Sequence, residues 1–205
     1  MGRFRDTLTG RHLMLDGETF STGASPVFVQ LACAEFWPAE PDRPGRVWAT
    51  HIDLADSMRV GRQLDASTLL WWMGEAGPEA LAAIVAGQRS KDRPPLGWRE
   101  ALEQLSEFAT GPTGRGLGHR PEPIGGVWSH GSAFDIARVE TAYADLRLPC
   151  PWDFRAQCDT RVLFRLAGSS LGNLAPPTGT KHDAAADVQQ QVAAVHAALD
   201  IMEKQ

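Results

Sequence analysis

The chain is predicted to be a single α/β domain over residues 1–205, with a mixed β-sheet of about five strands, one of them antiparallel, and helices on both faces. Three observations predict this class. Short apolar runs joined by short turns come first, which indicates antiparallel strands. Helical segments follow, and strand then alternates with helix. The length suits one sizeable core, and no linker or internal repeat divides it.

The predicted strands lie at residues 12–18, 27–36, 46–54 and 126–130. The first contains the run HLMLDGE, which is apolar without alternation until its acids, as is typical of a strand buried on both faces. Prolines and the Pro44-Gly45 pair mark the turn between the second and third strands.

The predicted helices follow from caps and from helical spacing of apolar residues. Asp65 or Ser67 can cap a helix that carries Trp71 and Trp72, which breaks at Gly77-Pro78 and resumes over 79–86. Further helices are predicted at 98–109, 132–146 and 183–203, with a short helix or strand-to-helix turn at 158–167 and loops at 88–97, 110–125 and 168–181.

The composition is that of an ordinary soluble globular protein, 43% hydrophobic and 22% charged. No stretch approaches the roughly 20 apolar residues that a membrane helix needs, and the N-terminus lacks the apolar core of a signal peptide. We therefore expect a cytoplasmic location and no membrane partner. The three cysteines have no CxxC spacing and are expected to be reduced thiols.

Asp16 and Glu18 stand two apart at the end of the first predicted strand. Residues i and i+2 of a strand point to the same side, so the two carboxylates are expected to converge. Acids placed against a buried strand need a partner, and hard oxygen ligands suit Mg²⁺ or Mn²⁺. The alternative is a solvated, inert acidic pair.

Asp135 follows the Gly131-Ser132 turn, and two interpretations of it stay open. Ser132 and Asp135 have the spacing of a capping box, which needs no metal. Alternatively, Asp135 lies in the first turn of the helix and faces the same strand edge as Asp16. A helix N-terminus there would also favour anionic substrates.

His182 and Asp187 are five apart, which on one helix separates them by roughly 140°. His182 is therefore expected in the loop before the last helix, and Asp187 inside that helix. A loop histidine with a near-neutral pKa can take a proton from an attacking water. The alternative is a surface histidine beside a capping Asp183.

Taken in order, DGETF, SHGSAFD and HDAAAD resemble the three motifs of the DEDD superfamily of 3′–5′ exonucleases, in its histidine-containing (DEDDh) branch with RNase T and proofreading exonucleases. The segments VFVQLACAEF, LLWWMGEAG and CDTRVLF resemble phage and bacterial exoribonuclease-like members, so the resemblance spans residue 12 to about 200. It implies an RNase H-like fold and His182 as general base. It also implies two Mg²⁺ or Mn²⁺ ions, held by Asp16, Glu18, Asp135 and Asp187. Gly17 departs from the family pattern, where a bulky apolar residue is more common, and so do Ser129 and His130, where an Asn is common.

The resemblance implies hydrolysis of phosphodiesters at the 3′ ends of DNA or RNA, with release of nucleoside 5′-monophosphates. The candidate substrate contacts are Thr19, Phe20, His130 and Phe134, and core packing is the alternative for both phenylalanines. A non-catalytic nucleic-acid- or protein-binding module on a nuclease fold is a second interpretation, and another metal phosphohydrolase is a third. The polymer, its strandedness and a homo-oligomeric state are left open.

The formal net charge of −5 does not exclude a nucleic-acid partner, because the four candidate carboxylates supply −4 of it and two divalent cations would cancel that share. Arginines cluster in several segments, one of which holds Arg155, Arg161 and Arg165. Each cluster is either a solvated face or a phosphate contact.

Overall fold

The computed structural model describes residues 4–111, 123–177, 179 and 181–204. Five strands form one sheet in the order β3-β2-β1-β4-β5. They are β1 (Arg11–Thr19), β2 (Phe28–Phe36), β3 (Val47–His51), β4 (Ile124–Ser129) and β5 (Gln157–Asp159). β2 is antiparallel to both of its neighbours, whereas β1, β4 and β5 are parallel. The predicted α/β class, with one strand running against the others, is confirmed.

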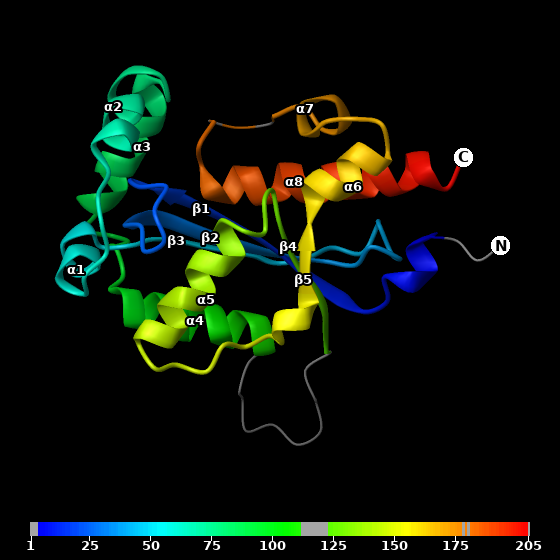
Figure 1. Cartoon of the computed structure of the whole chain (residues 1–205), viewed down its shortest axis with the longest axis horizontal. Coiled ribbons are helices and arrows are strands. Elements are labelled where there is room, and N and C mark those ends of the chain that lie inside the picture. Colours follow the sequence, from blue (N-terminus) through cyan, green and yellow to red (C-terminus); the bar gives the residue numbers. More distant parts are fainter. Residues whose placement is uncertain (1–3, 112–122, 178, 180, 205) are drawn as a thin grey trace.

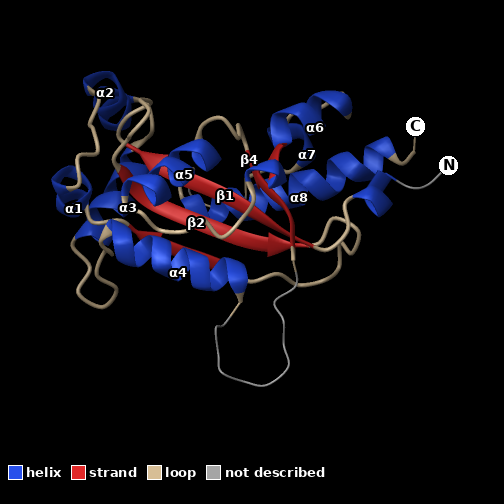
Figure 2. Cartoon of the chain, turned by 60° about the horizontal axis from the view of Figure 1, so that its bottom comes forward, coloured by secondary structure: helices blue, strands red, loops and turns tan. Residues whose placement is uncertain are grey.

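Helices cover both faces of this sheet. The helices of the described residues are α1 (Leu54–Arg59), α2 (Ala66–Gly74), α3 (Pro78–Gln88), α4 (Trp98–Thr110), α5 (Asp135–Asp145), α6 (Thr160–Leu166), α7 (Leu171–Leu174) and α8 (Ala184–Met202), with 3₁₀ turns at Phe4–Thr7 and Phe154–Ala156. α4 and α5 lie on one face, and α6, α7 and α8 lie on the other (Figures 1 and 2). In the part of the chain that the structure describes, no helix has the length and apolarity needed to cross a membrane.

β1 is buried on both faces, as its continuous apolar run predicts. Leu13 and Leu15 are fully buried in a cluster with α4 and α5, whereas Met14 is fully buried in a second cluster with α6 and α8. Because side chains alternate along a strand, Asp16 and Glu18 continue the row of Met14 and face α8. The core thus fixes which helix the two acids meet.

A third cluster attaches α2 and α3 to the end of β1. Trp72 is buried against Phe20, with ring centroids 5.8 Å apart, and its indole N–H donates to the Thr19 carbonyl at 2.8 Å. Asp65 caps α2 by accepting the backbone N–H of Ser67, which is one of the two predicted caps. The paired tryptophans are thereby held beside the acids of β1.

The third strand was predicted too long. It ends at His51, and Leu54–Arg59 form α1, because the side chain of Asp53 accepts the backbone N–H of Asp56 and starts a helix there. A short helix, α7, also lies within the predicted loop at 168–181. Most of the other predicted loop, at 110–125, lies outside the described residues.

The predicted start of α5 at Ser132 is also wrong, and so is the capping box. The helix begins at Asp135 without a side-chain cap. Ser132 is instead bound by Asp159 at the end of β5, whose Oδ2 accepts the Ser132 backbone N–H at 2.9 Å. The carboxylate of Asp135 is therefore not used for capping.

Candidate metal and catalytic site

Asp16 lies on β1 and meets α8. Its Oδ1 accepts a hydrogen bond from Nε2 of Gln191 at 2.8 Å. Gln191 is almost fully buried and lies one helical turn after Asp187. Spacing of four on a helix places both residues on one face, so α8 presents Asp187 and Gln191 together to β1. Gln191 was not predicted from the sequence, although its spacing of four from Asp187 is a signal for it.

Asp135 is brought to β1 from the opposite face of the sheet. The parallel pairing of β1 with β4 ends at Met14, so the backbone N–H of Gly17 has no partner in β4. The carboxylate of Asp135, at the first residue of α5, accepts that N–H. Gly17 itself has no room for a side chain, because a Cβ there would lie 2.4 Å from the ring of Phe28.

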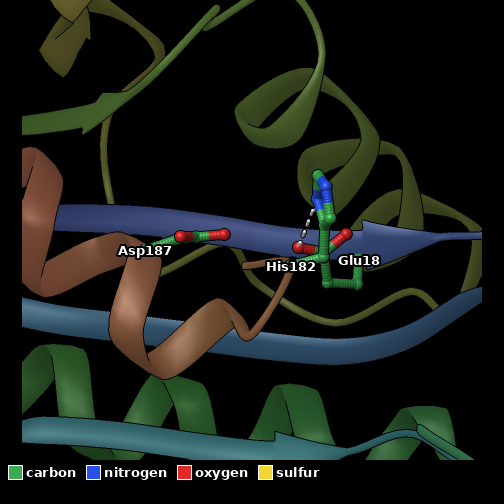
Figure 3. Close-up of side chains that lie close together, drawn as sticks. All are labelled: Glu18, His182 and Asp187. Atoms are coloured by element: carbon green, nitrogen blue, oxygen red, sulfur yellow. Dashed lines mark ion pairs between the residues drawn. The ribbon is translucent and has the colours of Figure 1, made fainter. Parts of the chain in front are cut away.

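His182 lies just before α8 and points at Glu18 (Figure 3). Its backbone has a φ of 60°, in the left-handed region, and Asp187 accepts its backbone N–H. Its Nδ1 is 3.9 Å from Oε1 of Glu18. Ligand atoms of Glu18, His182 and Asp187 all lie within 4.8 Å of one another. The loop-then-helix placement predicted from their spacing is confirmed.

The His182 ring is held by the two tryptophans of α2. Its centroid lies 4.9 Å from that of Trp71 and 5.7 Å from that of Trp72, both edge-on. Burial and the charge of Lys181 lower its pKa. The imidazole is therefore neutral near pH 7 and free to accept a proton.

The start of α8 is fixed against the sheet by Gln30, which pairs with Glu18 across β1 and β2. Oε1 of Gln30 accepts the backbone N–H of Ala184 at 3.1 Å, and Asp183 caps the helix through the N–H of Ala186. Gln30 thus links the strand beside Glu18 to the turn that carries His182. Asp183 therefore caps α8, as the alternative interpretation of this segment predicted. His182, however, is not a surface residue pointing away but is directed into the site.

All four carboxylates have a raised pKa. The pKa of Glu18 rises from 4.5 to about 8, first because of burial and then because of repulsion from Asp187 and Asp135. Burial raises the pKa of Asp135 to about 7 and that of Asp187 to about 6. The pKa of Asp16 lies well above its usual range for both reasons. Bound cations would supply the positive charge that keeps such a cluster ionised.

A pocket of about 650 Å³ opens beside this cluster. It is lined by the end of β1 and the turn after it, by α2, by the turns before α5 and α8 and by the start of α6, through Gly17, Glu18, Thr19, Thr22, Ser67, Thr68, Trp71, Trp72, Phe134, Arg161 and His182. The carboxylate of Glu18, a neutral histidine and aromatic rings therefore share one solvent-accessible space.

The four predicted substrate contacts are placed differently from one another. Thr19 and Phe134 line the pocket. Phe20 is buried in the third cluster against Trp72, so for this residue the alternative of core packing is confirmed. His130 hydrogen-bonds through Nδ1 to Thr160 at 2.9 Å and is not among the lining residues described.

The fold and the site define the class as an α/β protein with a carboxylate and histidine cluster beside a pocket. The crystal structure of cell-death related nuclease 4 (CRN-4) shares the fold, with a TM-score of 0.56 and 16% identity over 96% of this chain and 63% of that one. The chain thus spans 63% of the length of that nuclease. The 3′–5′ exoribonuclease Rv2179c-like domain family matches residues 11–199, and the chain belongs to this family. Among curated proteins, none matches the chain.

Proposed function

We propose that this chain is a DEDDh-type 3′–5′ exonuclease that removes nucleoside 5′-monophosphates from nucleic-acid 3′ ends. The observation that carries the proposal is the convergence of four carboxylates of raised pKa with His182 beside one pocket, which Glu18 and His182 line. The exoribonuclease name of the family favours RNA as the polymer.

The donor set fits Mg²⁺ or Mn²⁺, because hard carboxylate oxygens predominate in it. Two ions would be held by Asp16, Glu18, Asp135 and Asp187. When bound, the ions would polarise the attacking water and the scissile phosphate, and they would offset the negative charge of the carboxylates and the phosphate.

The side chains of the site have separate tasks. His182 accepts the proton of the attacking water on its neutral imidazole, and Trp71 and Trp72 hold that ring in place. Gln191 orients the Asp16 carboxylate by its hydrogen bond, and the Gly17 N–H does the same for Asp135.

A 5′-labelled single-stranded RNA incubated with Mn²⁺ tests the activity, with EDTA as the control. Stepwise shortening from the 3′ end and release of 5′-monophosphates are expected. His182→Ala should lose most turnover yet bind strand and metal, and Asp16→Asn should be inactive with either ion. His196→Ala, near the far end of α8, is the matched control and should keep activity.

Two other functions are separated by the same samples. A non-catalytic binding module would retain the labelled RNA without shortening it in Mn²⁺. A phosphohydrolase of small substrates would release phosphate from free nucleotides and leave the oligonucleotide intact. Wild-type rates in His182→Ala would refute the general-base role.

A further inference from the structure

Arg161 stands at the start of α6 and is fixed there by Asp159. Oδ1 of Asp159 accepts the Arg161 backbone N–H at 2.8 Å, and Oδ2 accepts the N–H of Ser132. Both oxygens of Asp159 are thereby occupied by the two turns that precede α5 and α6. The side chain of Arg161 projects past Gly131, where a Cβ would lie 2.8 Å from its Nη1.

The guanidinium of Arg161 is exposed in the pocket beside the carboxylates. It is the only arginine or lysine among the described residues that line this pocket. Its charge lowers the pKa of Asp135 and of His130, so it lies within electrostatic reach of both. Within the described ranges, however, the guanidinium has no hydrogen-bond or ion-pair partner. Its donors remain available to a ligand.

Phe134 lines the same pocket and packs against Arg138. The guanidinium of Arg138 lies 5.0 Å from the centroid of the Phe134 ring. Arg138 is itself held by hydrogen bonds to the carbonyls of Gly23 and Ala133. The wall of the pocket therefore offers both an aromatic ring and a free guanidinium fork, the combination that suits one nucleotide of a single strand.

We propose that Arg161 binds the phosphodiester immediately 5′ of the scissile one. The inference rests on the proposed function. The carboxylates and their ions serve the scissile phosphate, so the anion left for a free guanidinium in the same pocket is the next phosphate of the strand. A planar fork with five donors matches phosphate oxygens in a bidentate manner. A backbone phosphate carries no sequence information, so the contact does not depend on the bases. Because a free mononucleotide has no second phosphodiester, the contact favours a continuing strand.

Three variants test the contact by steady-state kinetics on single-stranded RNA. Arg161→Gln should raise KM about tenfold, the loss expected for a charged hydrogen bond, with kcat nearly unchanged. Arg161→Lys should recover part of the affinity, since it restores charge without the fork. Arg165→Gln, an exposed arginine one turn further along α6 and outside the pocket lining, is the matched control and should behave as wild type. Equal losses in both Gln variants would overturn the proposal.

A substrate with one uncharged methylphosphonate, placed at the linkage 5′ of the scissile bond, identifies the phosphate. Wild type should lose affinity for this substrate by about the same factor as Arg161→Gln loses on normal RNA. Arg161→Gln should lose nothing further. Additive losses would mean that Arg161 does not contact this phosphate, and they would overturn the proposal.

Equilibrium binding separates this proposal from the proposed function. Fluorescence anisotropy in the His182→Ala background reports binding without turnover. Arg161→Gln should weaken binding there and reduce the slope of log Kd against log salt by about 0.7, the value for one phosphate of a single strand. If wild type cuts RNA, but Arg161→Gln changes neither the binding affinity nor the salt slope, the Arg161 contact fails and the proposed function stands. If wild type never cuts, the proposed function fails, and the binding data alone decide the role of Arg161.

Discussion

Glu18→Gln should stabilise the chain in the absence of divalent metal. Burial and neighbouring acids raise the pKa of Glu18 from 4.5 to about 8. The folded chain therefore keeps a proton that the unfolded chain releases between those two values, so the free energy of unfolding falls as pH rises through this window. At pH 7 the difference amounts to at most about 3 kcal/mol.

Glutamine keeps the shape of Glu18 and removes its charge. The variant should gain about 2–3 kcal/mol at pH 7 in EDTA, equivalent to roughly 4–12 °C in Tm for a domain of this size. The gain should vanish near pH 4, where Glu18 is protonated in both states. Urea unfolding at pH 4, 5.5, 7 and 8 measures it.

Glu35→Gln is a control of opposite sign. Glu35 is buried on β2, but it accepts hydrogen bonds from Arg11 and Arg46, and its pKa is lowered. Its replacement leaves the buried Arg11 without its carboxylate and should destabilise by about 3 kcal/mol at pH 7. If Glu18→Gln is no more stable than wild type at pH 7, or gains equally at pH 4, the charge-cluster argument is wrong.

Three further predictions concern the same site. Binding of Mn²⁺ at pH 6.5 should release protons from carboxyl groups of raised pKa, so titration heats should differ between buffers of different ionisation enthalpy; identical heats would contradict this. Gln191→Leu should lower Mn²⁺ affinity about 10- to 100-fold by freeing Asp16, with an unchanged circular dichroism spectrum; an unaltered titration would exclude the orienting role. Trp71→Ala should lower kcat rather than KM, because the His182 ring loses its nearest aromatic neighbour, and Trp71→Phe should restore most of it. A change confined to KM would instead mean that Trp71 contacts the strand.

Much of this site follows from local periodicity. The two-residue repeat of a strand places Asp16 and Glu18 on one side, and both do face α8. The 3.6-residue repeat of a helix excludes His182 from the face of Asp187, and it does lie before the helix. Such periodicities depend only on neighbours in sequence, so the chain alone predicts them.

What the sequence could not supply is the choice between partners far apart in the chain. By spacing alone, Asp135 fits a capping box, in which its carboxylate would accept the Ser132 N–H. Asp159, 27 residues after Ser132, accepts that N–H instead. The carboxylate of Asp135 is then free to accept the N–H of Gly17 and join the acids of β1. The two interpretations of Asp135 competed for one carboxylate, and a contact between β5 and the turn before α5 decided between them.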